Sequence, residues 1–62
     1  MNIEKAKEIT TQEEARQFAV EWQAWQSTQV MSYSEMFEWQ EVLQGLGKRF
    51  KLSKEFRENG IL

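Results

Sequence analysis

The chain contains no histidine, cysteine, proline or aspartate among its 62 residues. Histidine is the usual base that activates a serine or cysteine nucleophile, so nucleophilic catalysis lacks its usual partner. Zinc sites rely mainly on cysteine and histidine, and only glutamate is present to replace them. These absences predict a protein that is not an enzyme, with no catalytic residue, no metal site and no cofactor.

Long hydrophobic runs are also missing. The longest strictly apolar run is Phe18-Ala19-Val20. It is far shorter than the roughly 20 residues that span a bilayer, and it is also shorter than the apolar core of a signal peptide. The glycines of Gly45-Leu46-Gly47-Lys48 lack both the spacing and the preceding strand of a phosphate-binding loop. The absence of cysteine fits a reducing compartment. We therefore expect a complete cytoplasmic chain that contacts no membrane and no small-molecule substrate.

The residues that are present predict helices, the first of them over 12–28. Thr11 and Glu14 form a capping box, and Thr10 with Glu13 offers an alternative frame. Apolar side chains then recur at steps of three and four, which places them on one face of a helix. These side chains are Ala15, Phe18, Ala19, Trp22 and Trp25.

A second helix is predicted over 33–50. Ser32 and Glu35 form another capping box, and Met31 and Met36 flank it as a hydrophobic staple. The apolar face crosses two glycines, and Gly47 could instead end the helix as a cap. We favour continuation, because the apolar spacing stays in phase to the end. The face consists of Met36, Trp39, Leu43, Leu46 and Phe50.

A short third helix is predicted over 54–59, with Ser53 as its N-cap. Gly60 follows it and suits the left-handed residue that ends many helices. Phe56 and Ile61 then occupy the two positions whose side chains pack together in a Schellman motif. The C-terminal segment is therefore expected to be a folded element.

The fold class that follows is all-α, in a single domain over 1–62. A short loop between the two long helices predicts an antiparallel hairpin, and the third helix covers its open side to give a small three-helix bundle. Residues 1–9 are expected to be a partly ordered arm, either a short helix or a segment laid across the bundle. No stretch alternates long enough to form a sheet.

The aromatic residues suggest both a core and a binding surface. Trp22 and Trp39 lie in the middle of their apolar faces and are expected in the core. Trp25 lies at the edge of its face, and Phe37 and Val20 lie away from theirs. For Phe37 two alternatives stay open: burial under the arm or the third helix, or exposure as an interface anchor. The candidate interface residues are therefore Phe37, Trp25 and Val20.

Charge is unevenly distributed along the chain. Residues 1–47 hold three basic and eight acidic side chains, a net charge of −5, whereas residues 48–62 hold five basic and two acidic, a net charge of +3. A basic cluster can contact nucleic acid, although cations also complement a helix C-terminus. Glu55 and Glu58 would face the phosphates if 33–59 acted as a helix-turn-helix. The candidate nucleic-acid residues are Lys48, Arg49, Lys51, Lys54 and Arg57.

Four short stretches carry a resemblance to a known group of proteins. They are residues 10–16 (TTQEEAR), Trp22-Gln23 with Trp25, residues 32–35 (SYSE), and 55–61 without Arg57. Together they resemble small uncharacterised helical proteins of Gram-positive bacteria and their prophages or mobile elements. The resemblance implies a compact helical protein of phage or mobile-element origin. It supplies neither an activity nor a ligand.

The sequence thus leads to two hypotheses from different classes. The first is a non-enzymatic helical module that binds another protein or a second copy of itself, motivated by aromatic side chains that one small core does not use. The alternative is a small nucleic-acid-binding protein that uses the basic segment 48–57, whose binding would fall steeply with salt.

Overall fold

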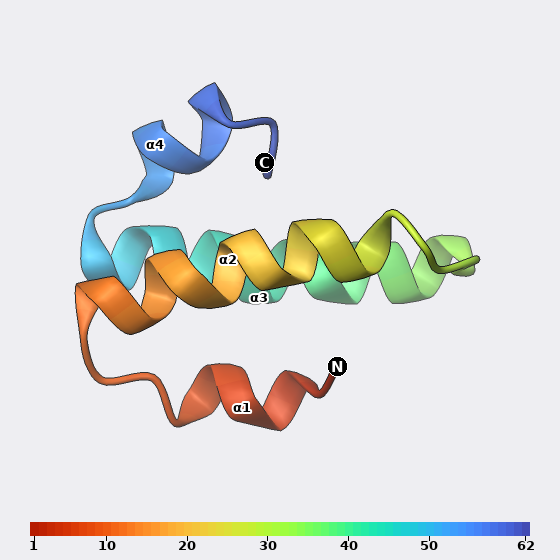
Figure 1. The fold of residues 1–62 in the computed structure, drawn as a ribbon, viewed down its shortest axis with the longest axis horizontal. Helices are drawn as coiled ribbons and strands as arrows, with labels where there is room; N and C mark the ends of the chain where they lie inside the picture. Colours follow the sequence, from red (N-terminus) through yellow and green to blue (C-terminus); the bar gives the residue numbers. More distant parts are fainter.

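A computed structural model describes all residues, 1–62, and contains four helices and no strand. In chain order they are α1 (Ile3–Lys7), α2 (Gln12–Gln26), α3 (Tyr33–Phe50) and α4 (Ser53–Glu58). The long helices α2 and α3 run antiparallel as a hairpin (Figure 1). The chain is therefore all-helical, as expected, and the N-terminal arm contributes a short helix of its own.

The caps predicted for the two long helices are confirmed. The Thr11 hydroxyl accepts a hydrogen bond from the Glu14 N–H at 3.1 Å, and the Ser32 hydroxyl accepts one from the Glu35 N–H at 3.3 Å. α3 has the predicted bounds, but α2 ends two residues before residue 28. The hydroxyls of Ser27 and Thr28 donate to backbone carbonyls three residues back, and such bonds compete with continued helix.

Trp39 is the centre of the core. Its ring centroid lies 6.2 Å from that of Phe18, 6.1 Å from that of Trp22 and 5.7 Å from that of Trp25. Aromatic pairs at such distances attract one another beyond their buried area. Burial of Trp22 and Trp39 confirms the prediction for both residues. The other buried core residues are Ala6, Ile9, Ala15, Phe18, Ala19, Leu43, Leu46, Leu52, Phe56 and Ile61.

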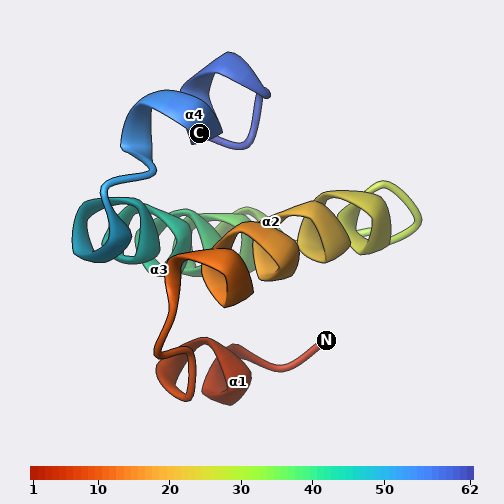
Figure 2. The ribbon, with the colours of Figure 1, turned by 60° about the vertical axis from the view of Figure 1, so that its left-hand side comes forward.

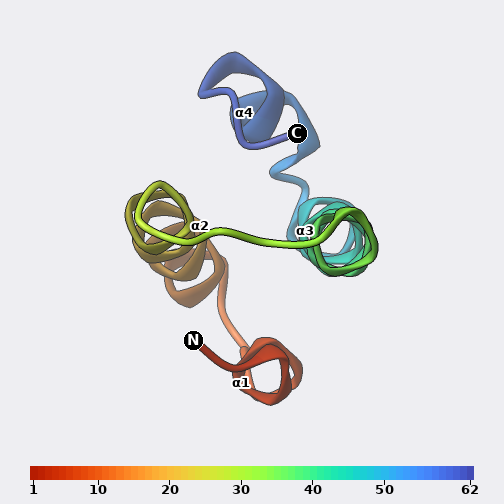
Figure 3. The ribbon, with the colours of Figure 1, turned by 90° about the vertical axis from the view of Figure 1, so that its right-hand side faces the viewer.

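The two short helices lie on opposite faces of the hairpin. Viewed along the hairpin, α4 is on one side of the α2–α3 layer and α1 is on the other (Figure 3). Both short helices cover the half of the hairpin that is remote from the α2–α3 loop (Figures 1 and 2). The N-terminal end of α1 reaches a hollow that Trp25 and Glu38 also line, and the rest of the half next to that loop has no helix over it.

The junction between α3 and α4 corrects the predicted N-cap. Lys51 adopts a left-handed conformation with φ 58°, and the Leu52 N–H donates to the Gly47 carbonyl at 2.7 Å. This turn buries Leu52, which takes the N-cap position without a side-chain cap. Ser53 is therefore the first residue of α4 rather than its N-cap, and it packs against Gly47.

The end of α4 is the predicted Schellman motif. Gly60 has φ 74°, its N–H donates to the Arg57 carbonyl, and the Ile61 N–H donates to the Phe56 carbonyl at 2.8 Å. Phe56 and Ile61 are both buried, as the hydrophobic pair of this motif requires. The turn brings the last residues back onto the hairpin.

Candidate functional site

The end of the hairpin next to the α2–α3 loop exposes large apolar side chains. We call residues 27–41 the hairpin tip. Tyr33 is 90% exposed and Phe37 is 61% exposed, while Val30 in the loop is fully exposed. Burial of Phe37 under the arm or the C-terminal helix is therefore wrong. The reason is that α4 lies over the other half of the hairpin, and the N-terminal residues line a hollow that does not include Phe37 (Figure 1).

A shallow recess forms part of this exposed surface. It has a volume of about 190 Å³ and is lined by Tyr33, Met36, Phe37 and Gln40. The Gln40 amide donates to the Ile61 carbonyl at 3.4 Å. The recess therefore begins where the C-terminal residues of the chain stop covering the hairpin. The side chains of Tyr33 and Phe37 share one face of α3, because they are four residues apart.

The hairpin tip carries negative charge only. Residues 17–47 contain four glutamates and neither lysine nor arginine. Glu35, Glu38 and Glu41 are exposed, and none of them forms a salt bridge. Glu41 lies one helical turn beyond Phe37 on the same face of α3. Glu35 accepts a hydrogen bond from the Ser32 hydroxyl at 3.3 Å, and neither Glu35 nor Glu38 lines the recess beside Phe37.

Trp25 lines a different hollow, on the α1 side of the tip. This hollow has a volume of about 580 Å³ and is formed by Met1, Asn2, Ile3, Trp25, Glu35, Glu38 and Trp39. Trp25 is half-buried, which confirms its predicted position at the edge of the core. The fold does not bring Trp25 into the recess that Phe37 lines.

Val20 is 55% exposed on α2, and it lines none of the hollows of the molecule. The structure therefore does not unite the three candidate interface residues into one surface. Tyr33, which the sequence analysis does not name as an interface candidate, lines the recess beside Phe37. The four-residue spacing between Tyr33 and Phe37 is the signal that would have identified it.

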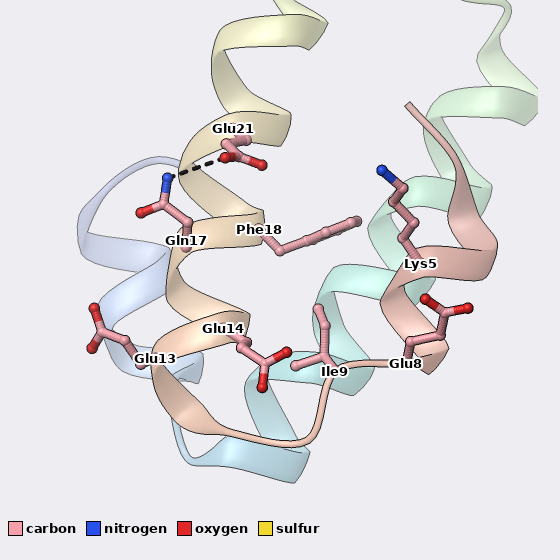
Figure 4. A pocket seen from close by; sticks show the side chains of 8 residues that line it. All are labelled: Lys5, Glu8, Ile9, Glu13, Glu14, Gln17, Phe18 and Glu21. Atoms are coloured by element: carbon pink, nitrogen blue, oxygen red, sulfur yellow. Dashed lines mark hydrogen bonds between the residues drawn. The ribbon is translucent and has the colours of Figure 1, made fainter.

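A second surface feature is an acidic hollow of about 470 Å³ between α1 and α2, shown in Figure 4. Ile9 and Phe18 supply its apolar part. Three of its four glutamates accept local hydrogen bonds: Glu13 from Arg16, Glu14 from two threonine hydroxyls, and Glu21 from the Gln17 amide at 3.2 Å. No three acidic side chains of the molecule are close enough together to hold a metal ion. This hollow is a solvated surface with internal hydrogen bonds.

The five basic residues of the C-terminal segment are at the opposite end of the hairpin from the tip. They are distributed over the end of α3, the turn and α4, and none forms a salt bridge. The Arg49 guanidinium lies over the Phe50 ring, 5.0 Å from its centroid. α4 has six residues and so is about 9 Å long, which is short for a helix that reads a groove.

One of the two glutamates expected to face phosphates is instead bound within the protein. Arg16 donates to both Glu55 carboxylate oxygens, at 2.7 and 3.1 Å. This hydrogen bonding lowers the pKa of Glu55 below its ordinary value and raises the pKa of Arg16. The pair joins α2 to α4, and the Gln23 amide adds a second link by donating to the Asn59 carbonyl at 3.0 Å. Sequence reasoning missed both links, because each joins residues far apart in the chain.

No helix combines the length and apolar character that crossing a membrane requires. Comparisons with protein-family models, curated proteins and solved structures give no match to this chain. The resemblance to small helical proteins of Gram-positive bacteria and their prophages therefore stays a prediction.

Proposed function

We propose that this protein is a non-enzymatic helical module that binds another protein through the hairpin tip. The observation that carries the proposal is the exposure of Phe37 and Tyr33, at 61% and 90%. A domain of this size needs most of its apolar side chains for its own core. Adjacent exposed aromatic side chains are typical of the anchors at protein interfaces.

The dimensions of the recess favour a protein over a small molecule as the ligand. Pockets that hold drug-sized ligands have volumes of about 300–1,000 Å³, whereas the recess beside Phe37 has about 190 Å³. A single apolar side chain projecting from a partner is a better match for this recess. The absence of histidine, cysteine and aspartate supports a role without catalysis.

Site-specific photo-crosslinking tests this proposal. A photoreactive phenylalanine replaces Tyr33 in one variant and the exposed Gln17 on α2 in a control, each produced in cells that naturally express the protein. We expect a discrete adduct with one protein from position 33, loss of that adduct when Phe37→Ser is added, and no such adduct from position 17. An adduct indifferent to Phe37→Ser, or none at all from position 33, would contradict the proposal.

Nucleic-acid binding is the second candidate. The specific observation in its favour is that all five basic side chains of 48–57 lack an acidic partner, while Glu55 is neutralised by Arg16. An amide NMR titration with duplex DNA at low salt tests it. Shifts confined to 48–57 that disappear when salt is added would support it, because phosphate contacts release counterions. Absence of shifts at low salt would eliminate it.

A further inference from the structure

We infer that Asn59 is a site of spontaneous covalent modification by deamidation, and that the docking of α4 on α2 controls its rate. Asn59 is followed by Gly60. Asparagine is a thermolabile residue, and it reacts most readily before glycine, which has no side chain to hinder attack by its own backbone nitrogen. The reaction is independent of the proposed function.

The reaction needs only the chain and water. The Gly60 backbone nitrogen attacks Asn59 Cγ and forms a bond to it, the bond from Cγ to Nδ2 breaks, and Nδ2 leaves as ammonia with the proton that Gly60 gave up. The product is a cyclic imide. Water then adds to either imide carbonyl carbon and breaks its bond to the Gly60 nitrogen, which regains a proton. Opening at Cγ leaves aspartate at position 59, and opening at the backbone carbonyl carbon leaves isoaspartate.

In the folded protein, solvent reaches both residues, but their reacting groups are engaged elsewhere. Asn59 and Gly60 are exposed. The Asn59 side-chain amide donates to the Glu55 carbonyl at 3.0 Å, and the Gly60 N–H donates to the Arg57 carbonyl at 3.2 Å. The proton that Gly60 must lose and the amide that it must attack are therefore each bound to a different carbonyl of α4.

The backbone of Asn59 also points the attacking nitrogen in the wrong direction. Its ψ is 5°, which places the Gly60 nitrogen in line with the Asn59 nitrogen rather than with the Cβ that carries the amide. Ring closure requires the peptide unit between the two residues to rotate toward Cβ. That rotation breaks the bond from Gly60 to Arg57.

A hydrogen bond from α2 holds the same peptide unit from its other side. The Asn59 carbonyl and the Gly60 N–H belong to one planar group. The Gln23 amide donates to this carbonyl at 3.0 Å, so the unit is hydrogen-bonded at both ends. The rotation that closes the ring therefore also separates the end of α4 from α2. Local opening takes microseconds to seconds, far less than deamidation, so the rate in the folded protein is the unfolded rate multiplied by the open fraction.

The products weaken the element that controls the reaction. Aspartate adds a negative charge at the C-terminal end of α4, where the helix dipole is already negative. Isoaspartate adds a methylene to the backbone and shifts the hydrogen bonds of the Schellman turn. This turn seats the buried Ile61, whose carbonyl accepts from Gln40 beside the recess. Deamidation thus acts as a one-way switch, because ammonia is lost, and it uncovers the hairpin next to the recess.

Mass spectrometry of the full chain at mildly alkaline pH tests the control by docking. The protein is incubated folded in buffer and unfolded in guanidinium chloride, and peptide mapping locates each modified residue. The variant is Gln23→Ala and its matched control is Gln17→Ala. Both side chains are exposed on α2, but the Gln17 amide donates to Glu21 of its own helix. Neither substitution changes the sequence around Asn59, so the unfolded rate stays the same.

We expect Asn59 to deamidate at least about tenfold more slowly in the folded protein than in the unfolded chain. Gln23→Ala should raise the folded rate by about two- to fivefold, as the loss of one hydrogen bond predicts, and Gln17→Ala should leave it unchanged. Asn2, which precedes the bulky Ile3, is the internal control and should stay unmodified. Equal folded and unfolded rates, or equal effects of the two variants, would overturn control by docking. An unmodified Asn59 in the unfolded chain would overturn the site itself.

Asn59→Asp tests the effect of the product on the fold. We expect a lower guanidinium midpoint at neutral pH and amide NMR shifts at Gln40 and Ile61, because the turn that joins them loosens. A midpoint and spectrum identical to those of the unsubstituted protein would overturn the switch.

Discussion

At the scale of single residues, two glycines of α3 have opposite roles. Gly45 is exposed, and a methyl group placed on it would meet no atom within 4 Å. Gly47 is buried, and a methyl group there would lie 2.9 Å from the Ser53 hydroxyl and 3.2 Å from the Ser53 Cα. The first glycine weakens the helix without a packing benefit, whereas the second allows α4 to approach α3.

The two alanine variants should therefore change stability in opposite directions. Gly45→Ala should raise the free energy of unfolding by about 0.5–1 kcal/mol, because alanine loses less backbone entropy in a helix. Gly47→Ala gains the same helix propensity but must displace the Ser53 backbone. A short hydrogen bond from the Leu52 N–H to the Gly47 carbonyl holds that backbone in place. We therefore expect the free energy of unfolding to fall by about 1 kcal/mol. Urea unfolding measures both. Equal stabilisation by the two variants would show that the contact between α3 and α4 is loose.

At the scale of elements, the ion pair between Arg16 and Glu55 links α4 to α2, and its contribution to the stability of the folded state depends on pH. Hydrogen bonding by Arg16 holds the pKa of Glu55 below its ordinary value of 4.5. A carboxylate whose pKa is lower in the folded state stabilises that state above its unfolded pKa. The contribution is then lost as pH falls below 4.5 through the folded value.

Replacing Glu55 with glutamine should reproduce this loss at neutral pH. We expect Glu55→Gln to lower the urea midpoint at pH 7, and its difference from the unsubstituted protein to shrink as pH falls below 4.5 and Glu55 becomes protonated. The midpoints of the two proteins, measured across this pH range, check the prediction. Exposed Glu58→Gln is the matched control, since Glu58 makes no salt bridge. A difference for Glu55→Gln that is constant with pH would assign the effect to packing instead.

A feature of these elements can be predicted from the sequence when the residues that form it are close together in the chain. The caps at Thr11 and Ser32 join residues three apart, so a local pattern reveals them. The ion pair of Arg16 with Glu55 joins residues 39 apart in the chain, and no local sequence pattern predicts it. The position of Ser53 inside α4 is not predictable locally, because the turn at Lys51 and Leu52 depends on packing against Gly47. The exposure of Phe37 was undecidable for a related reason, since it depends on where α4 and the C-terminal residues end.

At the scale of the whole molecule, folding is closely balanced. The folded chain exposes 4421 Å², so folding buries about 6,300 Å² relative to an extended chain. If about 60% of this area is apolar, its burial contributes about 95 kcal/mol as an upper bound. Ordering the chain costs about the same, at about 1.5 kcal/mol per residue. Domains of this size without disulfides rarely have a net stability above about 3–5 kcal/mol.

This narrow margin predicts different outcomes for two truncations of α3. Leu43 is fully buried, and its replacement by alanine should cost about 2–5 kcal/mol, enough to unfold much of the protein at room temperature. Phe37→Ala removes a larger side chain, yet its exposure of 61% predicts a change within about 0.5 kcal/mol. Helical circular dichroism and urea unfolding of both variants check this contrast.

The contrast also decides whether the tip belongs to the fold or to an interface. If Phe37→Ala proves as destabilising as Leu43→Ala, then Phe37 is buried in solution, and a second copy covering the tip is the simplest cause. Stability would then rise with protein concentration, because association favours the folded state. If Phe37→Ala leaves stability unchanged at every concentration, the aromatic surface contributes nothing to folding. A large apolar side chain that a marginally stable domain does not need for its core is then available for binding a partner.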